Sequence, residues 1–122
     1  MVRMDKRLSD YLACALWSSG EEYDDYGVFD FAPSALERAE KDLTDFWDKI
    51  LPHFDKYENW NDEPSDRDTA HDFWLTRCGH GTGFWDNPGI YGVENGEIFT
   101  QIAKEFGEAW LYIGDDDLVY FY

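Results

Sequence analysis

The chain has 122 residues, of which 27 are Asp or Glu and 10 are Lys or Arg, and its formal net charge is −17. This charge argues against direct binding of nucleic acid, which depends on neutralising phosphates, and against anionic membrane surfaces. Hydrophobic residues still make up 43% of the chain and aromatic residues 19%. Disordered acidic tails lack such a composition, so we expect a single folded domain over residues 1–122.

The two cysteines, Cys14 and Cys78, are too few for a disulfide framework. They are typical of free thiols in a reducing compartment. The chain contains neither the apolar run of a signal peptide nor one long enough to span a membrane. We therefore expect a cytoplasmic protein that is a monomer or a small homo-oligomer.

Apolar residues at steps of three and four predict three helices. The first covers residues 4–17 and the last about 95–107. The second begins at Ser34, and Pro52 is expected to end or kink it near Ile50 because proline removes a backbone donor.

The remaining segments predict strands. Residues 70–77 alternate between apolar and polar side chains, which favours a strand, with a helix capped by Ser65 as the alternative. A short strand is expected at 84–85, and residues 109–113 and 118–122 flank an acidic turn as a hairpin. The element order predicts an α+β fold, with a small antiparallel sheet of three to four strands packed with about three helices.

Few residues suggest catalysis or metal binding. His71, Asp72, Cys78 and His80 lie within ten residues of one another, but their spacing matches no established ligand pattern, and structural histidines are the simpler interpretation. The glycine-rich segment 79–83 lacks the lysine and following helix of a phosphate-binding loop. We therefore predict no enzyme activity, no metal and no cofactor.

The carboxylates suggest a binding surface instead. Asp42, Asp45 and Asp48 follow one another at three-residue steps along the second predicted helix, although Lys41 and Lys49 interrupt the pattern. Together with the acidic segments 21–25 and 115–117 they could imitate a track of DNA phosphates; the alternative is ordinary solvated surface. The predicted partner-binding residues are Asp24, Asp25, Asp42, Asp45, Asp48, Asp115, Asp116 and Asp117.

One block of sequence resembles a known family. HDFWLTR at 71–77, GHG at 79–81 and GFWD at 83–86 are similar to the signature of small acidic hypothetical proteins of bacteriophages and other bacterial mobile elements. Residues 15–19 and 103–116 are similar to the family's two terminal parts. The chain departs at Cys78 and Thr82, where Asn and Ala are expected. The resemblance implies a phage-type origin and a location in the host bacterial cytoplasm, and it transfers no catalytic residue.

Three functions follow as hypotheses. The first is a phage-type inhibitor that binds a basic nucleic-acid-binding host protein or complex, as an anti-CRISPR or antirestriction protein, by mimicking DNA phosphates. The second is a phage accessory protein with a ligand or catalytic pocket. The third is a structural or assembly protein that associates through exposed aromatic residues. The pocket of the second would be formed by His71, Asp72, Arg77, His80, Trp85 and Asp86.

Overall fold

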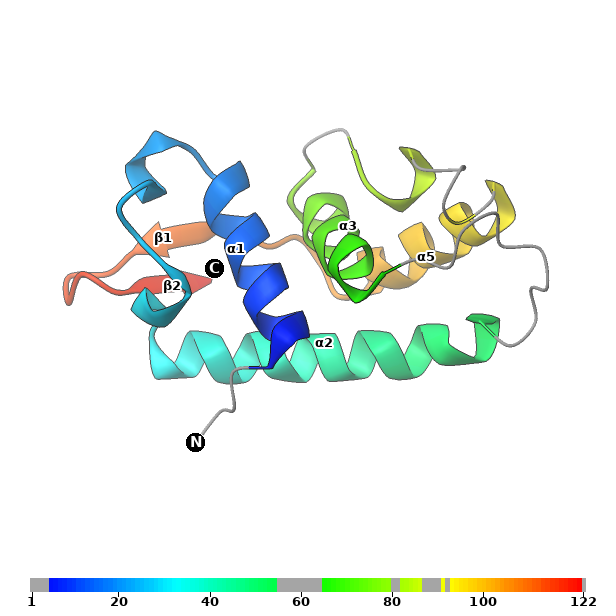
Figure 1. Cartoon of the computed structure of the whole chain (residues 1–122), viewed down its shortest axis with the longest axis horizontal. Coiled ribbons are helices and arrows are strands. Elements are labelled where there is room, and N and C mark those ends of the chain that lie inside the picture. The colour runs from blue at the N-terminus through cyan, green and yellow to red at the C-terminus, as the bar shows by residue number, and fades with distance from the viewer. Residues whose placement is uncertain (1–4, 55–64, 80–81, 87–90, 92, 122) are drawn as a thin grey trace.

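The structure is a computed structural model that describes residues 5–54, 65–79, 82–86, 91 and 93–121. Helix α2 (Pro33–Phe54) forms the base of the molecule, and α1 (Lys6–Ser18) crosses it (Figure 1). Helices α3 (Asp66–Cys78) and α5 (Val93–Glu105) pack toward one end of α2. The hairpin of β1 (Leu111–Ile113) and β2 (Val119–Phe121) lies toward the other end.

The predicted first helix is confirmed. Helix α1 starts where the Asp5 side chain accepts a hydrogen bond of 2.8 Å from the Leu8 amide, which satisfies one of the free amides of the first turn. Its buried face follows the predicted apolar stripe and consists of Leu8, Tyr11, Leu12, Cys14, Ala15 and Leu16.

The second helix is longer than predicted. Helix α2 begins at Pro33, where the fixed φ of proline suits the first helical position, and it continues past Pro52 to Phe54. Pro52 cannot donate to the carbonyl of Asp48, but both residues are exposed, so water can replace that bond. Of the two predicted effects of Pro52, an end of the helix near Ile50 is therefore wrong, and a kink there stays a prediction.

The predicted strand at 70–77 is also wrong, because these residues belong to α3. Ser65 caps this helix by accepting a hydrogen bond from the Asp68 amide at 3.0 Å, and Gly79 ends it with a φ of 71°. Buried positions surround much of α3, so no single apolar stripe marks it as a helix. They are Thr69, Ala70, Asp72, Phe73, Trp74, Thr76, Arg77 and Cys78.

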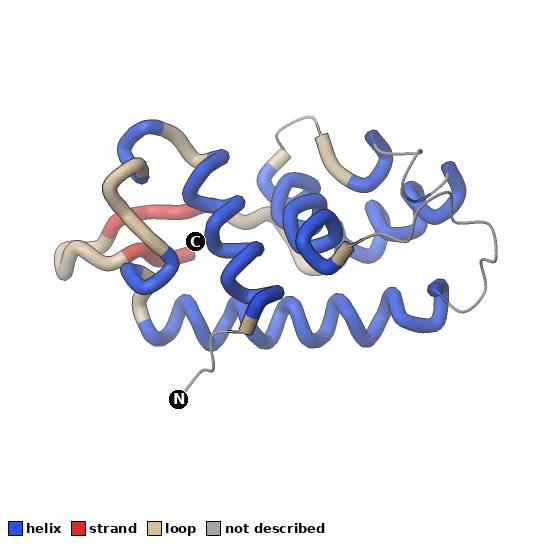
Figure 2. Tube along the Cα trace, viewed as in Figure 1, coloured by secondary structure: helices blue, strands red, loops and turns tan. Residues whose placement is uncertain are grey.

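The predicted α+β fold with three to four strands is contradicted. The described residues contain four α-helices and a sheet of two antiparallel strands, and Phe84–Asp86 form the short 3₁₀-helix η3 in place of a strand (Figure 2). The predicted hairpin is confirmed, with Leu111 opposite Phe121 and Ile113 opposite Val119. The protein is thus mostly helical.

The core is built largely from aromatic rings, which accounts for the aromatic-rich composition. The rings of Phe46 on α2 and Phe73 on α3 are stacked with their centroids 4.1 Å apart. Phe84 of η3 packs on Phe46 at 5.6 Å and on Phe99 of α5 at 5.6 Å. These contacts join the four elements at one centre and add to the burial of apolar surface.

Candidate protein-binding surface

Helix α3 distributes three of the predicted pocket residues over different sides. Successive helical residues are rotated by about 100°, so His71, Asp72 and Arg77 point in different directions. His71 lines a groove beside α1, Asp72 faces Tyr91, and Arg77 faces Tyr11. These members of the predicted pocket therefore do not share one cavity.

Asp72 forms a buried hydrogen bond with Tyr91. The Tyr91 hydroxyl donates to the Asp72 carboxylate at 2.7 Å, and both residues are buried. Burial and the neighbouring carboxylate raise the pKa of Tyr91, so its hydroxyl keeps the proton that it donates. A hydrogen bond to a charged group contributes about 1.5–3 kcal/mol, and this one fastens Tyr91 to α3.

Arg77 is the centre of a buried polar network. Its guanidinium donates to the Tyr11 hydroxyl at 3.0 Å, to the Asp42 carboxylate at 2.9 Å and to the carbonyls of Phe106 and Gly107, each at 3.1 Å. Only 2% of the Arg77 side chain is exposed. Burial raises the pKa of Tyr11 to about 12, which keeps this hydroxyl neutral. Arg77 therefore joins α1, α2 and the end of α5 and is inaccessible to a ligand.

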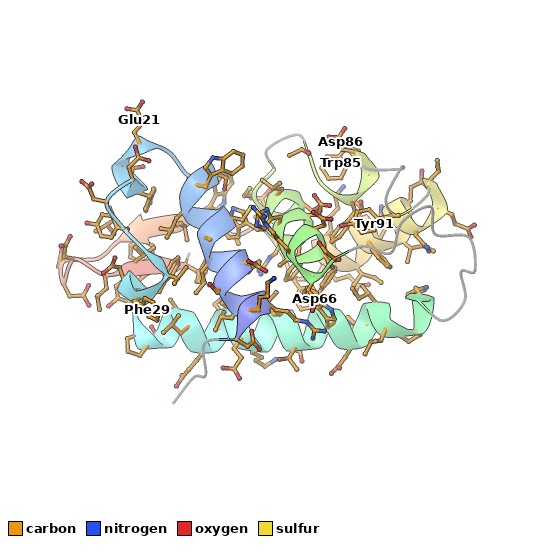
Figure 3. The ribbon with its side chains drawn as sticks, in the orientation of Figure 1. Glu21, Phe29, Asp66, Trp85, Asp86 and Tyr91 are labelled. Atoms are coloured by element: carbon orange, nitrogen blue, oxygen red, sulfur yellow. The ribbon has the colours of Figure 1, made fainter. Side chains whose placement is uncertain are left out.

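The last pocket residues lie on or near η3. Trp85 is 42% exposed, and Asp86 accepts a hydrogen bond of 2.9 Å from the Thr82 hydroxyl; both lie above α3 and α5 in Figure 3. His80 lies outside the described residues. Within the part of the chain that the structure describes, no three His, Cys, Asp or Glu side chains are arranged to hold a metal ion.

The predicted row of carboxylates on α2 is largely neutralised. Asp42 is paired with Arg77, and Asp45 accepts from Lys41 at 2.7 Å. Of the three, only Asp48 forms no ion pair with a residue that the structure describes. The row therefore does not present three free charges to a partner.

Two other acidic segments meet although they are far apart in the sequence. The Tyr26 hydroxyl donates a hydrogen bond to the Asp117 carboxylate, across a separation of 91 residues. The segment before α2 also runs beside β2, because the Ala32 amide donates to the Val119 carbonyl at 2.9 Å and Phe31 forms a bridge with the same residue. The loop and the hairpin turn thus form one surface at the end of the molecule where Figure 3 labels Glu21 and Phe29.

We call this surface the acidic end. Residues 20–32 contain five acidic side chains and residues 107–122 contain four, and neither segment contains Lys, Arg or His. Asp116 is further held by the Tyr120 hydroxyl, whose hydrogen bond lowers the pKa of this carboxyl. The exposed carboxylates that define the acidic end are Glu21, Glu22, Asp24, Asp25, Asp115, Asp116 and Asp117.

Phe29 is a surface residue that the sequence patterns did not single out. Its side chain is 82% exposed, in the 3₁₀-helix η2 (Val28–Asp30) that follows the acidic loop. Residues 20–33 have no apolar periodicity, so nothing local assigns Phe29 to the core or to the surface. Aromatic side chains are enriched at the centre of protein-binding surfaces, and polar residues surround them at the rim.

Comparison of the chain with protein-family models, with curated proteins and with solved structures finds no match in any of the three. The similarity to phage-encoded proteins therefore stays a prediction. Among the described helices, none is both long and apolar enough to cross a bilayer.

Proposed function

We propose that this protein is a phage-type inhibitor that binds a basic, nucleic-acid-handling complex of the bacterial host through its acidic end, as an anti-CRISPR or antirestriction protein. The hydrogen bond between Tyr26 and Asp117 carries the proposal, because it joins two acidic segments without cations into one surface. The exposed carboxylates of that surface would occupy Lys and Arg side chains that otherwise hold phosphate.

The electrostatics of the acidic end favour such a partner. Negative charges gathered on one surface create a field that attracts a positively charged partner and speeds association. The Tyr26 and Tyr120 hydroxyls hold Asp117 and Asp116 in place. Less side-chain freedom is then lost on binding than with freely rotating carboxylates.

Phe29 supplies the apolar contact that charge alone lacks. Surface ion pairs contribute little affinity on their own, whereas an aromatic side chain buried in a partner's pocket often carries much of the binding energy. With 82% of its surface exposed, Phe29 is free to enter such a pocket. The acidic end then supplies attraction and Phe29 supplies specificity.

The test is an affinity capture from bacterial lysate at low salt, with and without excess competitor DNA. We expect recovery of a nucleic-acid-binding complex that DNA displaces and that is lost as salt rises, because screening weakens interactions between exposed charges. A complex that stays bound in excess DNA would contradict competition for a phosphate-binding surface. A capture that returns no nucleic-acid-binding protein would contradict the proposed partner.

A further inference from the structure

A groove between α1 and α3 shares no residue with the acidic end. Near the start of α1, Arg7 donates to Asp66 of α3, and near its end Ser18 accepts from Trp74. The two helices therefore run in the same general direction. The groove between them has a volume of about 550 Å³ and is lined by Lys6, Asp10, Ala13, Cys14, Trp17, Arg67 and His71.

One end of this groove is cationic, in contrast to the acidic end. Lys6 and Arg67 lie in the first turns of their helices and both line the groove. Neither forms an ion pair with any residue in the described part of the chain. The starts of the two helices add partial positive charge from the backbone dipoles. A phosphate group is the anion that an exposed Arg and Lys pair binds well.

The other end carries an exposed ring. Trp17, in the last turn of α1, is 79% exposed and lines the groove. Ala13 lies one turn before it and leaves the groove open. A flat base can stack on such a ring, whatever its sequence identity. On α3, Arg67 lies about two turns, roughly 10 Å, before Trp74, whose indole donates to Ser18 next to Trp17. On α1, Lys6 lies about three turns, roughly 16 Å, before Trp17.

The middle of the groove offers a carboxylate acceptor. Asp10 lines this part of the groove from α1, and it forms no ion pair within the described part of the chain. His71 lines the groove from α3, and its ring nitrogens offer a donor and an acceptor. A ligand with hydroxyl groups at this level would donate hydrogen bonds to the Asp10 carboxylate.

We propose that the groove binds a mononucleotide, with its phosphate held by Lys6 and Arg67, its sugar hydroxyls donating to Asp10 and its base stacked on Trp17. Each part of the ligand then meets the side chain whose chemistry complements it, in the order in which the groove presents them. This site is independent of the acidic end.

Isothermal titration calorimetry of the full chain with AMP, GMP, CMP and UMP tests the proposal. We expect at least one of them to bind with a Kd of about 1 mM or tighter. The matching nucleoside and inorganic phosphate are each expected to bind at least about tenfold more weakly, because each lacks one half of the contacts. If none of the four nucleotides binds, or if inorganic phosphate binds as tightly as the nucleotide, the proposal is overturned.

Two pairs of variants separate the groove from general effects. Arg67→Ala is expected to weaken nucleotide binding about tenfold and to leave nucleoside binding unchanged, whereas Lys104→Ala, on the exposed side of α5, should change neither. Trp17→Ala should weaken both ligands, and Trp110→Ala, which removes another exposed indole, should weaken neither. All four side chains are exposed, so the folds should persist, and circular dichroism checks this. Equal binding by wild type, Arg67→Ala and Trp17→Ala would overturn the proposal.

Discussion

The buried Arg77 network predicts a large difference between two neighbouring aspartates of α2. The Arg77 side chain is only 2% exposed. Asp42→Asn removes the only carboxylate, among the described residues, that accepts a hydrogen bond from it. Breaking a buried ion pair costs about 3–5 kcal/mol of stability. Because Asn retains an acceptor oxygen and Asp42 is 20% exposed, we expect the free energy of unfolding to fall by about 2–4 kcal/mol. Asp45→Asn breaks an exposed pair with Lys41 and should cost about 0.5 kcal/mol or less.

The two variants are matched controls for each other. Both remove one negative charge from α2, so any relief of the general repulsion in a chain of net charge −17 is similar in both. Urea unfolding followed by tryptophan fluorescence should show a midpoint about 1–2 M lower for Asp42→Asn than for Asp45→Asn, with m unchanged. Free energies of unfolding that agree within about 0.5 kcal/mol would refute a stabilising role for the Arg77–Asp42 pair.

Three further predictions concern the core and the buried side chains. Gly→Ala inside a helix usually stabilises a protein by about 1 kcal/mol, but a Cβ on Gly96 would lie 2.8 Å from the Phe84 carbonyl oxygen. We therefore expect Gly96→Ala to lower the free energy of unfolding by about 1–3 kcal/mol. A raised Tm would contradict this packing. Burial lowers the pKa of His71 below its ordinary 6.5, so the unfolded chain binds the proton more tightly and stability falls as the pH drops from 6.5 through the folded pKa. His71→Gln should flatten this dependence of stability on pH. A His71 pKa of 6.5 or above, measured by NMR in the folded protein, would contradict the prediction. Cys14 and Cys78 are buried and burial raises the pKa of Cys14 to about 12, so both thiols should react with a thiol reagent at pH 8 only after unfolding in urea; rapid native labelling would count against it.

The sequence predicts those elements that have one buried and one exposed face. Helices α1, α2 and α5 bury one stripe each, and the hairpin flanks a turn of acidic residues, so local periodicity identifies them. Helix α3 is packed on several sides and buries polar residues such as Asp72 and Arg77 among its apolar ones. Its sequence therefore alternates by coincidence, and the cap at Ser65 was the better guide to its structure.

Among the predicted partner-binding residues, too, local sequence predicts exposure in some cases and not in others. Asp24, Asp25 and the turn 115–117 are exposed as expected, because acidic loops seldom find buried partners. Asp42 is only 20% exposed and is paired with Arg77, a contact that its local sequence could not predict because Arg77 lies 35 residues further along the chain. The contact between Tyr26 and Asp117 spans 91 residues, and no local pattern reports a contact at that distance.

If the acidic end is the binding surface, the position of the carboxylates, and not their number, determines the affinity for the partner. Two variants that each neutralise four carboxylates, and so bring the net charge from −17 to −13, test this against the captured partner over a range of salt concentrations. The acidic-end variant combines Glu22→Gln, Asp24→Asn, Asp25→Asn and Asp115→Asn. The control combines Glu37→Gln, Asp48→Asn, Glu94→Gln and Glu97→Gln, all exposed positions elsewhere.

We predict that the acidic-end variant binds at least about tenfold more weakly at low salt and shows a shallower salt dependence. The control should stay within about twofold of the wild type. Equal weakening of both variants would show that total charge alone drives binding, and wild-type affinity in the acidic-end variant would place the interaction on another surface; either result contradicts the account.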